Sequence, residues 1–300
     1  MVQVPRLELI KNDMSRQKIQ LRKMNLEDLP AALQLVESVG WNQTERDLKL
    51  FLEGENNIYL VAEIEKQVVG MVASIGYGMD VAWVSMMIVA EAFRGHSISK
   101  FLLNTLIQRL KTQGYQTIKL DATPAGRPVY RKLGFKEEYV INRFVHAHWP
   151  GLEHTPPKRQ ARPMINTDLP AVIGLDQAIF GAARVSLINR LFEDSPGYVV
   201  EKQNEIQAYV FGRKGRRLFQ IGPVGGRCFE DLQLLILLTL TKLTGQAVVL
   251  DVLTDKSLLI NWLNSLGFVC QRPFHRMYLE INKSPGEPAS QYCIAGPEFG

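Results

Sequence analysis

Apolar runs and segments of helical period alternate along the first half of the chain. Runs that are continuously or alternately apolar predict strands at residues 18–23, 58–64, 68–77, 81–89, 117–122 and 138–145. Apolar residues at helical spacing predict helices at residues 29–39, 45–52, 99–112 and 128–133. The polar triplet Glu65-Lys66-Gln67 predicts a tight turn that joins the second and third strands as a hairpin. This order is typical of an α/β fold (α+β mixed sheet) with helices on both faces.

The second half of the chain repeats landmarks of the first half. The segment 25–31 (NLEDLPA) recurs as 166–171 (NTDLPA), and each copy opens a helix of amphipathic pattern. Three further landmarks recur in the same order: Arg94, Leu120-Asp121 and Leu133-Gly134-Phe135 are matched by Arg227, Leu250-Asp251 and Leu266-Gly267-Phe268. The arginine lies 41 residues before the phenylalanine in both copies. The shared order predicts an internal duplication with a period of roughly 130–140 residues.

The duplication sets the expected domain organisation. A chain of 300 residues exceeds the size at which one hydrophobic core normally keeps growing. We expect a first copy at residues 1–148, a Pro-rich linker at 149–160 and a second copy at 161–282. Residues 283–300 form a tail rich in Pro, Gly and Ser, for which the sequence leaves two places open, an arm on a domain surface or a segment that reaches into the substrate cleft.

Composition places few further limits. The net charge of +5 suits an anionic ligand, but Lys and Arg are scattered, so no nucleic acid is expected as a partner. Three widely spaced cysteines form neither a disulfide framework nor a zinc pattern, which favours a reducing compartment. The N-terminus shows no signal sequence, and the longest apolar run, residues 234–238, is too short to cross a bilayer. We expect a cytoplasmic protein without a membrane partner.

A basic turn between a strand and a long helix is the chief candidate for a phosphate-binding site. The strand at 84–89 leads into Arg94-Gly95-His96-Ser97-Ile98-Ser99, and the helix that follows begins near Ser99. The first turn of a helix offers unpaired N–H groups and the positive end of the helix dipole, which together hold phosphate.

This stretch resembles the acyl-CoA-dependent N-acyltransferases of the GNAT superfamily. Their phosphate loop reads Arg/Gln-x-x-Gly-x-Gly/Ala, and a later helix often carries Tyr four residues before Gly-Phe. Here the loop is residues 94–99, with Ser97 and Ser99 in place of both glycines, and the later element is Tyr130-Arg-Lys-Leu-Gly134-Phe135. The resemblance implies two tandem GNAT-like domains, of which the first binds acetyl-CoA and is catalytic.

The resemblance also implies roles for individual residues. The main chain of the preceding strand would face the pantetheine arm, and the loop amides with two flanking cations would hold the phosphates. The implied acetyl-CoA contacts are Ile88, Val89, Arg94, Gly95, His96, Ser97, Ile98, Ser99 and Lys100. Tyr130 would donate a proton to the leaving thiolate. Asp80 is the candidate base, acting on the acceptor through a water molecule. No metal is expected, because His146, His148 and His154 lack a Cys or carboxylate partner at ligand spacing.

The second copy differs from the first at the positions that would carry chemistry. When Arg94 is aligned with Arg227, Ser97 matches Glu230 and Ser99 matches Leu232. A carboxylate at the phosphate position would repel the ligand. Tyr130 matches Leu263, which has no proton to donate. The second copy is therefore expected to be a degenerate GNAT-like domain that serves as scaffold and substrate wall.

Three functions fit the sequence. The first is an N-acetyltransferase that moves an acetyl group from acetyl-CoA to an amine of a small molecule or peptide, by direct attack in a ternary complex. The second is a non-catalytic, GNAT-derived metabolite-binding protein with a weakened CoA site. The third is transfer of an aminoacyl or longer acyl group. The acceptor half of such sites is built from early helices and variable loops, here residues 40–44 and 77–80, so fold resemblance does not give the acceptor or the oligomeric state.

Overall fold

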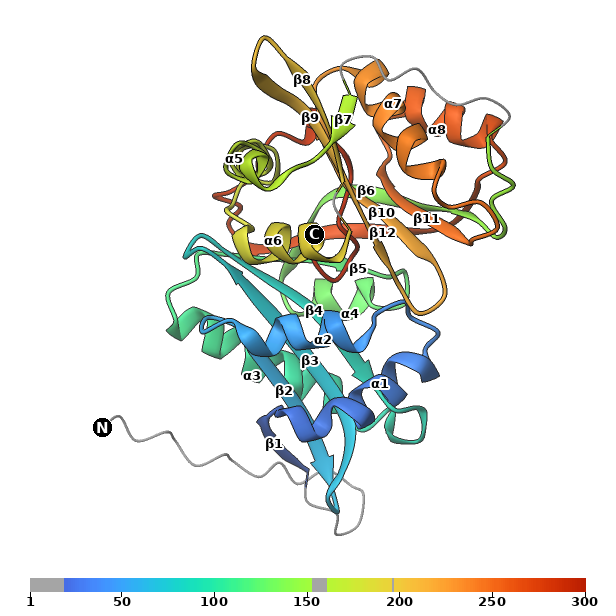
Figure 1. The fold of residues 1–300 in the computed structure, drawn as a ribbon. Coiled ribbons are helices and arrows are strands. Elements are labelled where there is room, and N and C mark those ends of the chain that lie inside the picture. Colours follow the sequence, from blue (N-terminus) through green and yellow to red (C-terminus); the bar gives the residue numbers. More distant parts are fainter. Residues whose placement is uncertain (1–18, 153–160, 196) are drawn as a thin grey trace. The chain divides into compact units, whose positions relative to one another are not determined.

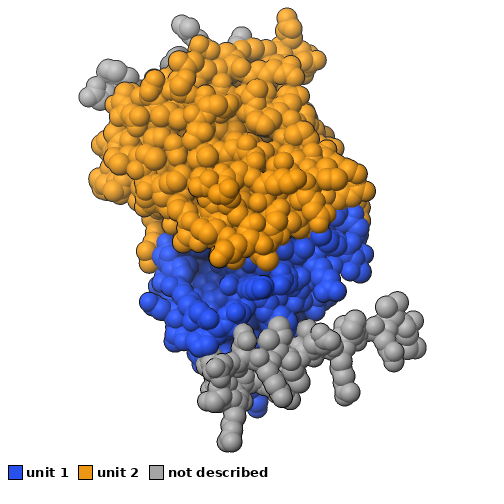
Figure 2. Space-filling view, turned by 180° about the vertical axis from the view of Figure 1, so that it is seen from behind, with its two compact units in different colours: residues 1–76, 84–115 blue, residues 77–83, 116–300 orange. Residues whose placement is uncertain are grey.

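The computed structural model describes residues 19–152, 161–195 and 197–300 (Figure 1). Lys18 of the first predicted strand, the predicted linker residues 153–160 and His154 fall outside the described residues. The chain forms two compact units (Figure 2). Unit 1 comprises the chain up to residue 76 and residues 84–115, and unit 2 comprises residues 77–83 and 116–300. Among the described residues, no helix has both the length and the apolar character needed to span a bilayer.

Unit 1 contains the first strands and helices at the predicted places. Its strands, in sheet order, are β1 (Gln20–Lys23), β2 (Ile58–Ile64), β3 (Gln67–Tyr77) and β4 (Val81–Val89), of which the last two extend into unit 2. Its helices are α1 (Leu29–Ser38), α2 (Glu45–Glu53) and α3 (Ile98–Thr112). In Figure 1, α2 lies in front of these strands and α3 behind them. The predicted hairpin is confirmed, since β2 and β3 pair antiparallel through a turn in which Glu65 and Lys66 have φ of 49° and 67°.

Unit 2 contains the remaining strands and helices. Its strands include β5 (Thr117–Ala122), β6 (Phe135–His146), β7 (Ala161–Pro163), β8 (Tyr198–Lys202), β9 (Glu205–Lys214), β10 (Phe219–Gly226), β11 (Val248–Leu253), β12 (Val269–Glu280) and β13 (Gln291–Cys293). From the Val81–Trp83 end of β4 they run in the order β5-β12-β6-β11-β13-β10-β9-β8-β7. The helices are α4 (Arg127–Lys132), α5 (Leu169–Phe180), α6 (Val185–Asp194), α7 (Phe229–Leu240) and α8 (Ser257–Ser265). Parallel and antiparallel pairs both occur, so the predicted mixed sheet is confirmed.

The two copies carry the same ion pair at the start of their first helices. Arg22 Nη1 lies 2.6 Å from Asp28 Oδ2, and Arg162 Nη1 lies 2.6 Å from Asp168 Oδ2. In both copies the aspartate also accepts a hydrogen bond from the main-chain N–H three residues before it. The ion pair recurs together with its local backbone geometry, which supports the duplication predicted from the sequence.

The last long strand of each copy pairs with strands of the other copy. Strand β6, which follows α4 of the first copy, pairs antiparallel with β11 of the second copy over six residue pairs. Strand β12, the corresponding strand of the second copy, pairs antiparallel with β5 of the first copy over six residue pairs. The two exchanged strands also pair with each other. Strands β5 to β13 therefore form one continuous part of the sheet, in which the strands of neither copy are complete without those of the other.

Two buried ion pairs, one for each exchanged strand, join the copies. Arg143 of β6 donates two hydrogen bonds to Asp251 of β11, at 2.7 and 2.8 Å. Arg276 of β12 donates two to Asp121 of β5, at 2.9 and 2.8 Å. Side-chain exposure is at most 8% in all four residues. Each guanidinium thus neutralises a carboxylate that has no access to water, and removal of one partner would leave a buried charge unpaired.

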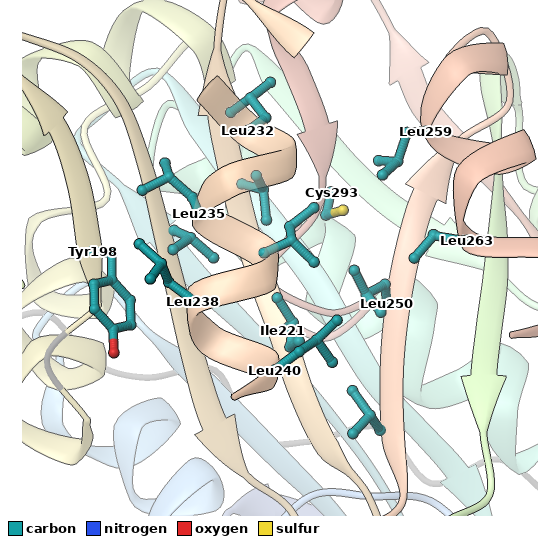
Figure 3. Packing of buried hydrophobic residues seen from close by; sticks show 14 of the residues in the cluster. Tyr198, Ile221, Leu232, Leu235, Leu238, Leu240, Leu250, Leu259, Leu263 and Cys293 are labelled. Carbon is teal, nitrogen blue, oxygen red and sulfur yellow. The ribbon is translucent and has the colours of Figure 1, made fainter. Parts of the chain in front are cut away.

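The main core of the second copy lies between helix α7 and the strands beneath it. Leu232 and Leu235 of α7 belong to one cluster with Ile221 of β10 and Leu250 of β11, and all four side chains are fully buried (Figure 3). Cys293 of β13 belongs to the same cluster and is also fully buried.

The prediction that the tail is an arm on a domain surface is wrong for residues 291–300, since β13 is an interior strand of the sheet and most of residues 294–300 are buried.

Arg143→Ala should lower the free energy of unfolding by about 3–5 kcal/mol, because Asp251 would remain buried without a counter-ion. Urea denaturation followed by circular dichroism measures this loss. The matched control is Arg127→Ala, which breaks the pair with Glu137, where both side chains are about a third exposed. That variant should lose less than about 1 kcal/mol. Equal losses in the two variants would contradict the role given to the buried pair.

Candidate functional site

The basic turn has the backbone conformation that a glycine-containing phosphate loop requires. Gly95 has φ of 83°, and Ser97 has φ of 61° with ψ of 11°, so both lie in the left-handed region. Ser97 is the N-cap of α3, although its side chain makes no capping hydrogen bond. A non-glycine residue in this conformation costs roughly 1–2 kcal/mol. Ser97 therefore adopts a conformation that favours glycine.

The N-terminus of α3 offers donors and positive charge without competing carboxylates. The N–H groups of Ile98, Ser99 and Lys100 lie in the first helical turn, where helix geometry leaves them without an intrahelical acceptor. No acidic residue lies in this turn. Arg94 and Lys100 are exposed, and Arg94 Nε donates a hydrogen bond to the Val89 carbonyl at 3.2 Å. The arrangement is suited to a polyanion such as a diphosphate.

Strand β4 brings the chain to this turn with an irregular backbone. Met86 has φ of 54°, a left-handed residue inside a strand. Within unit 1, β4 is the edge strand next to β3, and the N–H of Ala90, just after the strand, donates to the Val69 carbonyl at 2.8 Å. Ile88 is buried and Val89 is half-buried. The opposite edge of β4 therefore presents main-chain donors and acceptors that the strands of unit 1 do not use.

Tyr130 lies in unit 2 on the short helix α4. Its ring packs edge-to-face on Phe135, with the centroids 5.8 Å apart. Gly126 leaves room for the ring, since a Cβ at that position would lie 3.0 Å from Tyr130 Cε2. Burial raises the pKa of Tyr130 to about 12. Within the described part of the chain, the hydroxyl has no hydrogen-bond partner, so the protonated phenol can donate to a ligand at neutral pH.

Asp80 lies in an exposed turn, and the described histidines belong to no group that could hold a metal ion. Asp80 is exposed in the turn between β3 and β4, where Gly78 has φ of 60°. Its role as a base stays a prediction. No group of three or more His, Cys, Asp or Glu side chains among residues 19–152, 161–195 and 197–300 is placed to hold a metal ion.

The corresponding turn of the second copy is shorter than expected and already carries acidic groups. Helix α7 begins at Phe229, two residues after Arg227, whereas α3 begins four residues after Arg94. Glu230 therefore occupies the second helical position, which matches Ser99 and not Ser97 as the ungapped alignment predicted. Glu230 and Asp231 both lie in the first turn of α7. Their carboxylates take the place near the helix dipole that a phosphate would need.

The second copy also lacks the phenol. Leu263 of α8 lies four residues before Gly267, and Tyr130 of α4 lies four residues before Gly134. The predicted match of the two residues is therefore confirmed. The Leu263 side chain is fully buried in the core. This position of the second copy therefore serves packing (Figure 3).

Two features near the site were not predicted from the sequence. The left-handed Met86 lies inside an apolar run that reads as regular strand, and no residue type in that run signals it. The close approach of Tyr130 to Gly126 had a sequence signal, because a glycine two residues before Pro128 interrupts the helical pattern.

Two family models match the chain. The model described as "Acetyltransferase (GNAT) family" matches residues 21–135, and the model described as "Acetyltransferase (GNAT) domain" matches residues 172–293. Together the two matches cover well over half of the chain.

Solved structures share the fold at low sequence identity. A Pyrococcus horikoshii protein assigned to the acetyltransferases has a TM-score of 0.80 at 17% identity, covering 97% of this chain and 99% of that chain. A tandem GNAT protein from the clavulanic acid biosynthesis pathway has a TM-score of 0.65 at 14% identity, with 89% and 99% covered. A GCN5-related N-acetyltransferase from Sphaerobacter thermophilus has a TM-score of 0.62 at 14% identity, with 89% and 96% covered. The chain belongs to the GNAT acetyltransferase family and contains two GNAT domains in tandem.

Proposed function

We propose that the protein is an N-acetyltransferase that uses acetyl-CoA and acetylates an amine of a small molecule or peptide. The observation that carries the proposal is the left-handed turn at Gly95 and Ser97, which leads into a helix start free of acidic residues. The second copy has neither the same turn length nor a free helix start. The proposed activity therefore belongs to the first copy.

The first copy supplies groups for each part of acetyl-CoA. The diphosphate would accept hydrogen bonds from the main-chain N–H groups between Gly95 and Lys100, with Arg94 adding charge. Main-chain groups of Ile88 and Val89, on the edge of β4 that unit 1 leaves unused, would bind the amides of the pantetheine arm. His96 lies in the turn with Nδ1 3.4 Å from the Phe93 carbonyl, so its ring is directed back toward the turn.

The reaction needs one proton removed and one proton added. The neutral amine attacks the thioester carbonyl carbon, the carbon–sulfur bond breaks, and the amine proton is released as the new amide forms. An alkyl ammonium has a pKa near 10, so a base or a water path must first deprotonate it at neutral pH. Asp80 would serve through water. The Tyr130 hydroxyl would donate its proton to the leaving sulfur, which gives the thiol of CoA, and the proton released from the amine would restore the phenol.

Ser97→Glu should abolish acetyl-CoA binding, because it places a carboxylate among the donors proposed for the diphosphate. Thermal unfolding with and without the ligand measures this. For the wild-type protein, acetyl-CoA at a hundred times its dissociation constant should add about 2.7 kcal/mol of stability. The variant should show no ligand-dependent shift.

Two variants act as controls for Ser97→Glu. Gln108→Glu adds the same charge to an exposed position on the same helix and should keep the shift. Ser97→Gly removes the cost of the left-handed serine, so the free protein should become more stable by about 1 kcal/mol with ligand binding kept. An undiminished shift in Ser97→Glu would refute this placement of the ligand.

Tyr130→Phe should lower the turnover number by about tenfold to a hundredfold and leave acetyl-CoA affinity nearly unchanged, since only the proton donor is lost. Steady-state release of free CoA thiol, with an amine found by an acceptor screen, measures the rate. Tyr278→Phe removes a hydroxyl from β12 of the second copy and serves as the control. A wild-type rate in Tyr130→Phe would exclude the phenol from the mechanism.

A further inference from the structure

Strands β10 and β11 of the second copy separate along their length, and a third strand lies between them. They pair in parallel from Phe219↔Val248 to Ile221↔Leu250. Beyond that point β13 pairs antiparallel with both, through Val224↔Cys293 on β10 and Val252↔Cys293 on β11. The N–H of Ile294 then donates to the Asp251 carbonyl at 3.0 Å. The edge of β10 beyond Ile221 is therefore paired by a strand from the same chain.

The same edge has a different proposed use in the first copy. Strand β10 is the counterpart of β4, because each precedes the basic turn and the long helix of its copy. In the first copy the unused edge of β4 is where the acyl-CoA arm is proposed to bind. In the second copy Gly225 of β10 pairs instead with Gln291. The space is filled closely, since a Cβ on Gly222 would lie 2.0 Å from the Ile294 carbonyl oxygen.

Residues 296–300 continue past β13 and are held by buried side chains. The Tyr77 hydroxyl donates to the Phe299 carbonyl at 2.8 Å, and Trp83 Nε1 donates to the Pro297 carbonyl at 3.1 Å. The Arg184 guanidinium donates to the Gly300 carbonyl. Arg184 precedes α6, one of the two early helices of the second copy, and those helices correspond to the ones expected to build an acceptor site.

Residues before β13 also lie against groups that correspond to the site of the first copy. The N–H of Glu287 donates to the Ile179 carbonyl of α5 at 2.8 Å. Its carboxylate Oε2 lies 4.0 Å from Nη2 of Arg227, the counterpart of Arg94. Both side chains are largely exposed, so this pair adds little stability. It does place an anionic group of the chain beside the arginine that would otherwise face a phosphate.

We propose that residues 287–300 are an internal occupant of the second copy's ligand site, a segment of the chain that lies where acyl-CoA and an acceptor would lie. The inference rests on the proposed function, because the edge of β10 is identified through its counterpart β4. An added strand is bound through main-chain hydrogen bonds, the mode by which sheets also bind peptides. Because the segment is covalently tethered, its effective concentration far exceeds that of a free ligand. The second copy is thus permanently closed, and among the described residues the proposed acyl-CoA site is that of the first copy.

Cys293 reports directly on this segment in the full chain. Its side chain is fully buried on β13, and burial raises the pKa of its thiol well above the usual value. Cys270 is exposed and serves as the internal reference. The test is the rate of iodoacetamide alkylation at each cysteine, located by peptide mass spectrometry, for the wild-type and Ser97→Glu proteins with and without millimolar acetyl-CoA.

Cys293 should react at least about a hundredfold more slowly than Cys270, since the buried thiol reacts only after local opening. Acetyl-CoA should leave the Cys293 rate unchanged in both proteins. A Cys293 rate close to that of Cys270 would overturn the proposal, because the site would then be open. Faster Cys293 alkylation with acetyl-CoA would also overturn it, because the ligand would then displace the segment.

A variant at a residue that holds residues 296–300 completes the test. Tyr77→Phe removes the donor to Phe299 and should raise the Cys293 rate by about threefold to tenfold, with Tyr278→Phe as the control. An unchanged rate would contradict the role given to residues 296–300. Failure of the proposed function would appear differently, as a missing acetyl-CoA thermal shift in the wild-type protein with Cys293 still protected.

Discussion

The exchange of β6 and β12, fixed by two buried arginine–aspartate pairs, is the constraint on which the rest of unit 2 depends. Arg143 neutralises Asp251, and Arg276 neutralises Asp121, so each copy supplies the guanidinium that the other copy needs. Neither copy could be removed without leaving a charge buried and a sheet edge open. We therefore expect the first copy to fold only together with the second copy.

The two copies share the same order of strands and helices but differ in the residues at the N-terminus of the helix that follows the basic turn. Helix α3 begins with free N–H groups after a left-handed turn, whereas the first turn of α7 carries Glu230 and Asp231. The dipole at the start of α7 is therefore satisfied by the protein itself, and the dipole at the start of α3 remains for an external anion. Together with the internal occupant proposed at β13, this difference is the basis for proposing acyl-CoA binding at the first copy.

The sequence predicted the local elements well, because their signals are local. Every predicted strand and helix of the first copy occurs, and the largest boundary error is at β6, which begins at Phe135 and not at residue 138. The strand exchange could not be predicted, since β6 and β12 have the same apolar pattern whichever copy they complete. The place of residues 291–300 was also beyond the sequence, because a short segment rich in Gly and Pro carries no pairing signal. The left-handed backbone of Ser97 could not be predicted from its residue type either, because the turn imposes it.

The most direct test of the account is the number of acetyl-CoA molecules that bind one chain. Native mass spectrometry of the full chain, titrated with acetyl-CoA under non-denaturing conditions, gives this number. The account predicts saturation at one molecule per chain, bound at the turn between β4 and α3. Two molecules per chain would show that the second copy is open, and none would show that the turn at Gly95 and Ser97 does not form an acyl-CoA site.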